Sequence, residues 1–261
     1  MNWMLEKLYF DLQTPDGTAF IGYRAELKAG CICMPYAASL LKKSGQNPLI
    51  RQSLLRGRIT AENDETRWQH KHLGLTGRWR PGNEGLPYFR ADYSQGFIDW
   101  KVLGAGVSAQ VRFQDGSVIS GSGYWEKMLM TLPPWCLPFP ELKWGRFLAD
   151  DGENYLVWVA WLGGNDELCR LWSRTGELAG LDFKPDGLSF SDGILTFSGN
   201  EILRAGPLFK SLCGPLNGLA AIFPNGLGQA REDKYFSRAL WTRPNGEPLP
   251  GWAIHETVFW R

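Results

Sequence analysis

The sequence has almost no net charge and no long apolar run. Its 28 basic and 27 acidic residues give a net charge of +1, so it lacks the basic surface that nucleic-acid binding requires. No stretch of about 18 apolar residues is present, which argues against a membrane-spanning helix. The N-terminal stretch MNWMLEKLYFDLQTPDG shows no charged leader before an apolar segment, so we expect no signal peptide. We therefore expect a cytoplasmic protein that binds no nucleic acid.

Cysteine and histidine are also scarce. The five cysteines are Cys31, Cys33, Cys136, Cys169 and Cys213. Their number is odd and their spacing is scattered, so we expect free, mostly buried thiols in a reducing compartment. His70 and His72 would share one strand face, but no further ligand stands at a suitable spacing, and no metal site is expected. We interpret His255 as a satisfied core or surface residue rather than a catalyst.

Helical periodicity is nearly absent, whereas aromatic residues, glycine and proline are abundant. The chain holds 13 Trp, 14 Phe and 8 Tyr beside 31 Gly and 16 Pro. Aromatic residues favour strands, and glycine and proline favour the turns between them. Turn signals recur at intervals typical of a sandwich or barrel, so we predict an all-β fold. Only residues 34–56 have helical character, and we expect there an irregular excursion with a short helix.

A proline-rich segment divides the chain. Pro133, Pro134 and Pro138 cannot lie in a central strand, because proline has no N–H to donate to the ladder. This segment is the best candidate for a crossover between two halves. We predict an N-terminal β-barrel over residues 1–135 and a C-terminal β-barrel over residues 136–261.

One acidic residue stands in an otherwise apolar and aromatic strand of the first half. Because side chains alternate along a strand, Glu126 shares its face with Tyr124 and Met128, while Trp125 and Lys127 lie on the other face. An inward carboxyl group would be costly to ionise, so burial would raise its pKa and keep it protonated. The simpler alternative is that Glu126 pairs with a cation or a backbone donor in an ordinary core.

A protonated carboxyl group among aromatic rings suits one kind of chemistry. Such a group can protonate an alkene or epoxide, and the rings can stabilise the resulting cation. The last strand offers a second acid on an apolar stripe, Glu256. The sequence shows no Gly-x-Ser-x-Gly nucleophile motif and no phosphate-binding loop.

The motif Gly123-Tyr124-Trp125-Glu126-Lys127, followed by the proline-rich crossover and Trp144-Gly145-Arg146-Phe147, resembles the lipocalin-like group of carotenoid 1,2-hydratases, tocopherol cyclases and their relatives. The resemblance implies two lipocalin-like (calycin-type) barrel halves in one chain. It also implies that Glu126 is the acid that protonates a C=C bond in an apolar tunnel, with Tyr124 beside it.

These observations predict a cofactor-independent cyclase or hydratase for an isoprenoid or polyene substrate. Glu126 would donate the proton, and Tyr124 would orient Glu126 or relay the proton. Water or an internal hydroxyl would capture the cation. The predicted substrate-binding residues are Trp125, Met128, Trp135, Trp144 and Glu256. The expected partner is an apolar small molecule, whose uptake would allow transient contact with a membrane surface. The alternatives are a non-catalytic carrier of an apolar ligand and a barrel with a filled interior.

Overall fold

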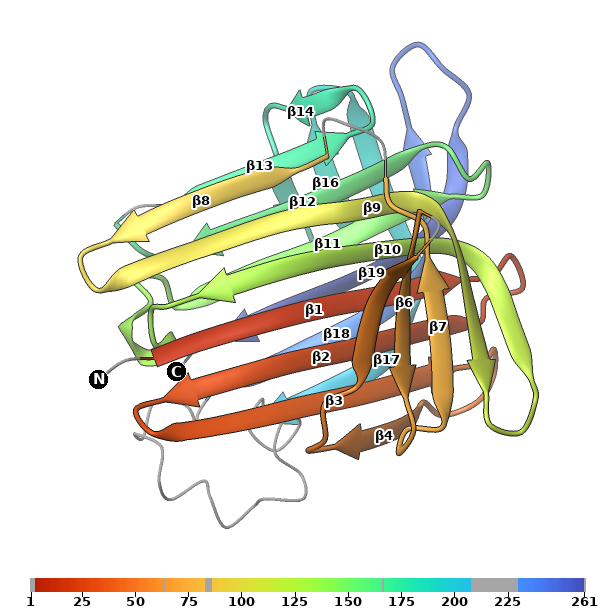
Figure 1. Cartoon of the computed structure of the whole chain (residues 1–261). Coiled ribbons are helices and arrows are strands. Elements are labelled where there is room, and N and C mark those ends of the chain that lie inside the picture. Colours follow the sequence, from red (N-terminus) through yellow and green to blue (C-terminus); the bar gives the residue numbers. More distant parts are fainter. Residues whose placement is uncertain (1–2, 63, 83–85, 166, 208–229, 261) are drawn as a thin grey trace. The chain divides into compact units, whose positions relative to one another are not determined.

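The protein consists of two units of antiparallel strands (Figure 1). The computed structural model describes residues 3–62, 64–82, 86–165, 167–207 and 230–260. Contacts divide the chain into the units Met1–Pro133 and Pro134–Arg261. Within the described residues the only helix is the short 3-10 helix η1 (Pro134–Cys136), which lies in the proline-rich segment. The predicted all-β fold is therefore confirmed.

The N-terminal unit is a ten-stranded sheet in which the last strand returns beside the first. Its path is β4-β3-β2-β1-β10-β9-β7-β6-β5, with β8 paired to β9. The strands are β1 (Trp3–Gln13), β2 (Ala19–Ala29), β3 (Ile32–Lys42), β4 (Leu49–Ser53), β5 (Arg58–Glu62), β6 (Glu65–His70), β7 (Leu75–Trp79), β8 (Tyr88–Tyr93), β9 (Gly96–Phe113) and β10 (Val118–Met130).

The C-terminal unit repeats this plan with nine strands. Its path is β14-β13-β12-β11-β19-β18-β17-β16-β15, so β11 lies between β12 and the last strand, as β1 lies between β2 and β10. The strands are β11 (Glu141–Ala149), β12 (Tyr155–Leu162), β13 (Leu168–Ser173), β14 (Gly176–Leu178), β15 (Asp182–Lys184), β16 (Gly187–Phe190), β17 (Gly193–Pro207), β18 (Arg231–Thr242) and β19 (Leu249–Phe259).

The expectation of a short helix within residues 34–56 is wrong. This segment contributes most of β3 and all of β4, and β3 pairs with β2 along its whole length. The sequence MPYAASLLK contains good helix formers, but pairing with β2 buries Ala37, Ala38 and Leu40. Burial and ladder formation thus outweigh a weak local propensity.

Each unit has its own aromatic core on one face of its sheet. In the N-terminal unit Phe10 stacks between Trp68 and Trp125, with ring centroids 5.7 and 5.8 Å away, and lies 4.7 Å from the Trp79 ring. The Trp79 indole N–H donates to the Asp11 carbonyl over 2.7 Å. We call this group of side chains, completed by Leu8, Leu12, Phe20, Leu73, Leu75 and Val111, the N-terminal core.

The C-terminal core is built around Trp158. Trp158 packs in one cluster with Phe147, Trp241 and Phe190. Its ring covers the backbone of Gly145 on the neighbouring strand. An added Cβ at Gly145 would lie 2.2 Å from Trp158 Cζ2. Glycine is therefore the residue that lets the indole lie flat on the strand.

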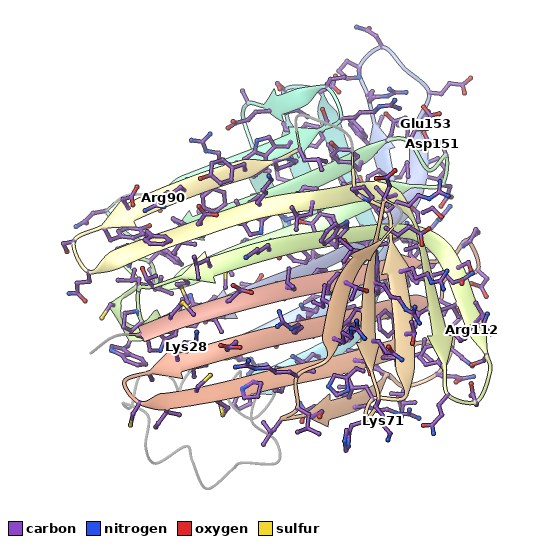
Figure 2. The ribbon with its side chains drawn as sticks, viewed as in Figure 1. Lys28, Lys71, Arg90, Arg112, Asp151 and Glu153 are labelled. Atoms are coloured by element: carbon purple, nitrogen blue, oxygen red, sulfur yellow. The ribbon has the colours of Figure 1, made fainter. Side chains whose placement is uncertain are left out.

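Most charged side chains of the described residues are exposed, as is usual for folded proteins. Figure 2 labels six exposed examples: Lys28, Lys71, Arg90, Arg112, Asp151 and Glu153. A smaller set of charged side chains is buried, with less than a tenth of the surface exposed. This set includes Asp11, Glu126, Glu232, Lys234 and Glu256. Buried charges are the informative ones, because each must be compensated by a specific partner.

The expectation of mostly buried thiols is wrong. Cys31, Cys33 and Cys169 are free and exposed, and Cys136 is half-buried. Cys213 lies outside the described residues.

Replacing Gly145 by alanine should lower the free energy of unfolding by about 1–3 kcal/mol, because the new methyl group overlaps the Trp158 ring. Urea unfolding followed by circular dichroism measures the change. In the W158F background the same glycine replacement should cost less, since the smaller ring leaves room for the methyl group. A G145A protein as stable as the parent would contradict the packing described.

Candidate functional site

Glu126 is buried on β10 and held by two donors. Its side chain is 4 % exposed. The Tyr124 hydroxyl donates to Glu126 Oε2 over 2.5 Å, and the Trp100 indole N–H donates to the same oxygen over 2.8 Å. Tyr124 is fully buried and Trp100 is 4 % exposed. The predicted inward orientation of Glu126 and its proximity to Tyr124 are thus present in the structure.

Two irregularities of the β9–β10 ladder bring Trp100 to this position. The register skips Gly106, whose φ is 65°, and then Leu103. A skipped residue in one strand is a β-bulge, which bends the strand and shifts its pairing. Without these two bulges Trp100 would lie two residues farther along β10 from Glu126. With them it stands opposite Met128, diagonal to the carboxyl group.

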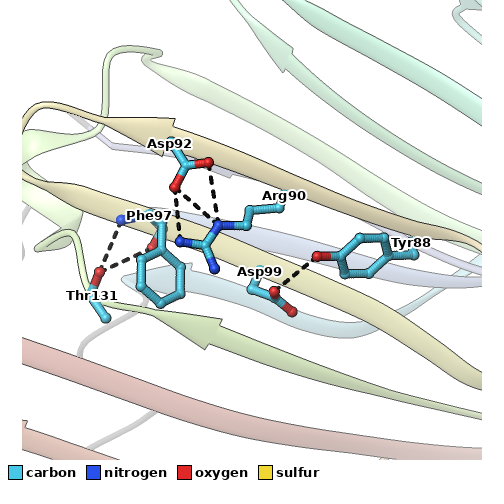
Figure 3. Close-up of polar contacts among 6 residues, drawn as sticks. All are labelled: Tyr88, Arg90, Asp92, Phe97, Asp99 and Thr131. Atoms are coloured by element: carbon cyan, nitrogen blue, oxygen red, sulfur yellow. Dashed lines mark hydrogen bonds and ion pairs between the residues drawn. The ribbon is translucent and has the colours of Figure 1, made fainter.

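Contacts on both faces of the β8–β9 hairpin hold Trp100 in place. On the buried face, the Phe89 ring packs against Trp100 with centroids 5.2 Å apart. On the exposed face, the polar contacts drawn in Figure 3 join Tyr88 to Asp99, Arg90 to Asp92, and Phe97 to Thr131. The backbone that carries Trp100 is therefore held by contacts that do not involve Glu126.

Tyrosine rings adjoin the carboxyl group on the β1 and β2 side. Tyr9 stands opposite Glu126 in the ladder, and its ring centroid is 6.0 Å from that of Tyr124 and 5.3 Å from that of Tyr23. The Lys7 ammonium lies 5.3 Å from the centroid of the Tyr23 ring. A cation over a tyrosine ring is an attractive contact, and it shows that this aromatic wall accommodates positive charge.

Sequence reasoning missed four residues of this site: Lys7, Tyr9, Asp11 and Trp100. Asp11 is fully buried and lies opposite Tyr124 in the ladder, diagonal to Glu126. Alternation of side chains places Lys7, Tyr9 and Asp11 on one face of β1. With the pairing of β1 and β10 known, this alternation predicts that the three residues lie beside Glu126. The bulges that bring in Trp100 have no such signal.

The arrangement can hold and move a proton. Both hydrogen bonds described are accepted by one carboxyl oxygen, so the group is fixed in a single orientation among rings. Hydrogen bonds to a carboxylate stabilise its charged form. A carboxyl group held in this way can donate a proton from its acid form and accept one back as carboxylate.

The other predicted residues of the N-terminal unit fall on two faces. Met128 is half-buried and shares the face of Glu126. Trp125 lies on the opposite face, within the N-terminal core, where its indole N–H donates to the Arg80 carbonyl over 3.0 Å. Its packing therefore accounts for its burial, and it does not adjoin the carboxyl group.

The three predicted residues of the C-terminal unit also differ in setting. Trp135 lies in η1 and is 37 % exposed. Trp144 on β11 stands opposite Glu256 on β19, and both are buried. Glu256 forms an ion pair with Lys234, whose ammonium lies 5.6 Å from the centroid of the Trp144 ring.

Glu256 belongs to a network of buried charges. Lys234 also pairs with Glu232 over 3.4 Å, and Glu232 pairs with Arg204 over 3.4 Å. All four side chains are less than a tenth exposed. Two cations and two anions compensate one another. The free-energy cost of burying these charges is therefore offset only while each partner is present.

Replacing Lys234 by methionine should lower the free energy of unfolding by about 3–5 kcal/mol, because it leaves two buried carboxylates without this cation. The matched control is Arg231→Gln on the same strand, which removes an exposed pair with Asp233 and should change stability by less than about 1 kcal/mol. Chemical unfolding of both variants makes the comparison. Equal effects would contradict the burial of the network.

His70 is buried and His255 is half-buried, and both rings are satisfied by neighbours. His70 Nδ1 accepts the Leu73 N–H over 3.2 Å, so Nε2 carries the hydrogen that faces the Leu55 carbonyl at 2.9 Å. His255 stacks on Phe197 with centroids 4.3 Å apart and lies 3.0 Å from the Ser237 hydroxyl through Nε2. Burial lowers the pKa of His255 to about 4.

The lowered pKa of His255 predicts a pH-dependent stability. The unfolded chain takes up a proton near pH 6.5, whereas the folded chain resists it until about pH 4. Stability contributed by the neutral ring is therefore complete above pH 6.5 and is lost as the pH falls to 4, by about 3 kcal/mol in total. His255→Phe should remove this part of the slope between pH 7 and 4.5, as measured by urea unfolding. An unchanged slope would refute the assignment.

Solved structures show that the fold is shared with known proteins. Kievitone hydratase from Nectria haematococca matches with a TM-score of 0.59 and 11% identity over 98% of this chain and 88% of its own. CghA matches with a TM-score of 0.62 and 10% identity over the same shares, and CghA with Sch210972 matches with a TM-score of 0.61 and 10% identity. No family model matches the sequence, and no curated protein matches it.

These likenesses confirm the fold that the motif resemblance implied. The chain shares its all-β fold with these structures and spans most of their length. At about a tenth of identical residues the comparison concerns the fold alone. In the described part of the chain, we find no helix with the length and apolar character needed to cross a membrane.

Proposed function

We propose that the protein is an enzyme of the hydratase or cyclase type that protonates a C=C bond of an apolar, isoprenoid-like substrate. The observation that carries the proposal is the buried Glu126 carboxyl group, oriented by Tyr124 and Trp100 among tyrosine rings. The shared fold with kievitone hydratase supports it by analogy.

The proposed reaction needs only one proton and one nucleophile. In its acid form, Glu126, oriented by the bonds from Tyr124 and Trp100, would transfer its carboxyl proton to an alkene carbon. The π electrons form the new C–H bond, and the neighbouring carbon becomes a cation that the rings stabilise. Water or an internal hydroxyl then bonds to the cation, and its proton returns to Glu126. The cycle uses no cofactor.

The test is isotope incorporation with the purified protein and the apolar molecules that co-purify with it. In D₂O, mass spectrometry should find one carbon-bound deuterium per turnover, and H₂¹⁸O should add ¹⁸O only if water captures the cation. Glu126→Gln should lower turnover at least about 1,000-fold with the ligand still bound, and Tyr124→Phe should lower it about 10- to 100-fold.

The control variant is Glu6→Gln, which alters a half-exposed acid on β1 that pairs with Arg24 and Lys127. It should turn over like the parent protein. A bound ligand that no variant converts would show a carrier rather than an enzyme. Full activity in Glu126→Gln would rule out the proposed proton donor.

A further inference from the structure

A hollow of about 500 Å³ lies at one end of the N-terminal unit. It is formed by the end of β3, by β4, and by the turns β3–β4, β6–β7 and β9–β10, which gather at that end (Figure 1). The volume is in the range of small-molecule sites. None of the residues that line it contacts Glu126.

The floor of the hollow is apolar. It is made by Leu41, Leu73 and Phe113. Leu73 is 1 % exposed and belongs to the N-terminal core, and Phe113 packs against the same core. Leu41 and Phe113 are half-buried, so they offer apolar surface to a chain or ring of a ligand.

The rim carries more positive than negative charge. Its charged lining residues are Lys43, Arg51 and Asp115, and Figure 2 shows Lys71 and Arg112 at the same end of the unit. The Ser117 hydroxyl and N–H donate to Asp115 Oδ1 over 2.6 and 2.9 Å and lower the pKa of the Asp115 carboxyl. The positive charges of Arg51 and Lys43 lower this pKa further, so Asp115 is ionised and offsets one of the two cations, which leaves the rim with one net positive charge.

The walls are preformed by contacts between the turns. Arg51 Nη1 donates to the Leu73 carbonyl over 3.1 Å, which ties β4 to the β6–β7 turn. The Gln114 N–H donates to the Gly74 carbonyl over 2.8 Å, which ties the β9–β10 turn to the same place. A ligand would therefore meet a shaped site and would not have to order three loops.

We propose that this hollow binds an amphipathic anion, with an apolar chain or ring on the floor and one carboxylate or sulfonate at Lys43 and Arg51. The site is separate from the proposed catalytic site. Ser117 lies nine residues from Glu126 along the chain, about 30 Å along a strand, and the floor belongs to the opposite face of the sheet. Either proposal can fail while the other holds.

The experiment is a ¹⁵N–¹H NMR titration of the whole protein with octanoate, 1-octanol and octylammonium, which share one chain and differ in charge. Octanoate should shift the amides of Gly74 and Gln114–Ser117 with a Kd at least fivefold below that of 1-octanol. Octylammonium should bind more weakly than 1-octanol, because its charge meets the cationic rim.

Variants separate the charge of the rim from the apolar floor. Lys43→Gln should raise the octanoate Kd two- to threefold while the 1-octanol Kd stays unchanged, and K43Q/R51Q should remove the preference for octanoate over 1-octanol. Leu41→Trp should weaken binding of all three probes, because the larger side chain occupies part of the hollow. The control Lys101→Gln removes an exposed cation of β9 outside the hollow and should change nothing.

Three results would overturn the proposal. One is equal affinity for the three probes, and another is a set of shifts confined to amides outside these turns. The third is octanoate binding that survives in K43Q/R51Q or Leu41→Trp at the parent affinity.

Discussion

The site depends on the hydrogen bonds that stabilise a carboxyl group in buried, aromatic surroundings. Burying an ionisable group without partners costs several kcal/mol, so Glu126 requires its donors to be in place before any ligand arrives. Tyr124 supplies one from the same strand, two residues away, as the alternation of side chains dictates. Trp100 supplies the other from the neighbouring strand, and it reaches the carboxyl group only because the ladder is bulged. The irregular backbone is thus part of the site.

The two units show that one strand plan can treat its buried charges in different ways. The C-terminal unit gathers Arg204, Glu232, Lys234 and Glu256 into a network of ion pairs. At the corresponding first and last strands of the N-terminal unit, β1 and β10, Glu126 accepts hydrogen bonds from the neutral Tyr124 and Trp100, and Lys7 and Asp11 share the face of Tyr9 on β1. An ion pair keeps both of its partners in their charged forms, whereas neutral donors leave the carboxyl group able to change its protonation state. This difference favours the N-terminal unit as the place of proton transfer.

Simple patterns in the sequence predicted much of the fold. Turn signals, scarce helical periodicity and the three prolines of the crossover gave the all-β architecture, and alternation placed Tyr124 with Glu126 and apart from Trp125. The segment around Ala37 and Leu40 was mispredicted because its local helix propensity is weaker than pairing with β2. Trp100 could not be predicted, because the skipped positions Leu103 and Gly106 shift the register and no local pattern reports such a shift.

The N-terminal sheet also shows how two sites can coexist on one set of strands. β10 presents Tyr124 and Glu126 on one face, while Trp125 on the other face helps close the N-terminal core. The hollow at the β9–β10 turn stands on that core through Leu73 and Phe113. Because a packed aromatic core lies beneath the hollow and on the face opposite Glu126, a ligand there cannot touch the carboxyl group. Two connections join the sites: β10 itself, which runs from the turn at the hollow to Glu126, and the core beneath the hollow, in which Trp125 stacks on Phe10 with centroids 5.8 Å apart.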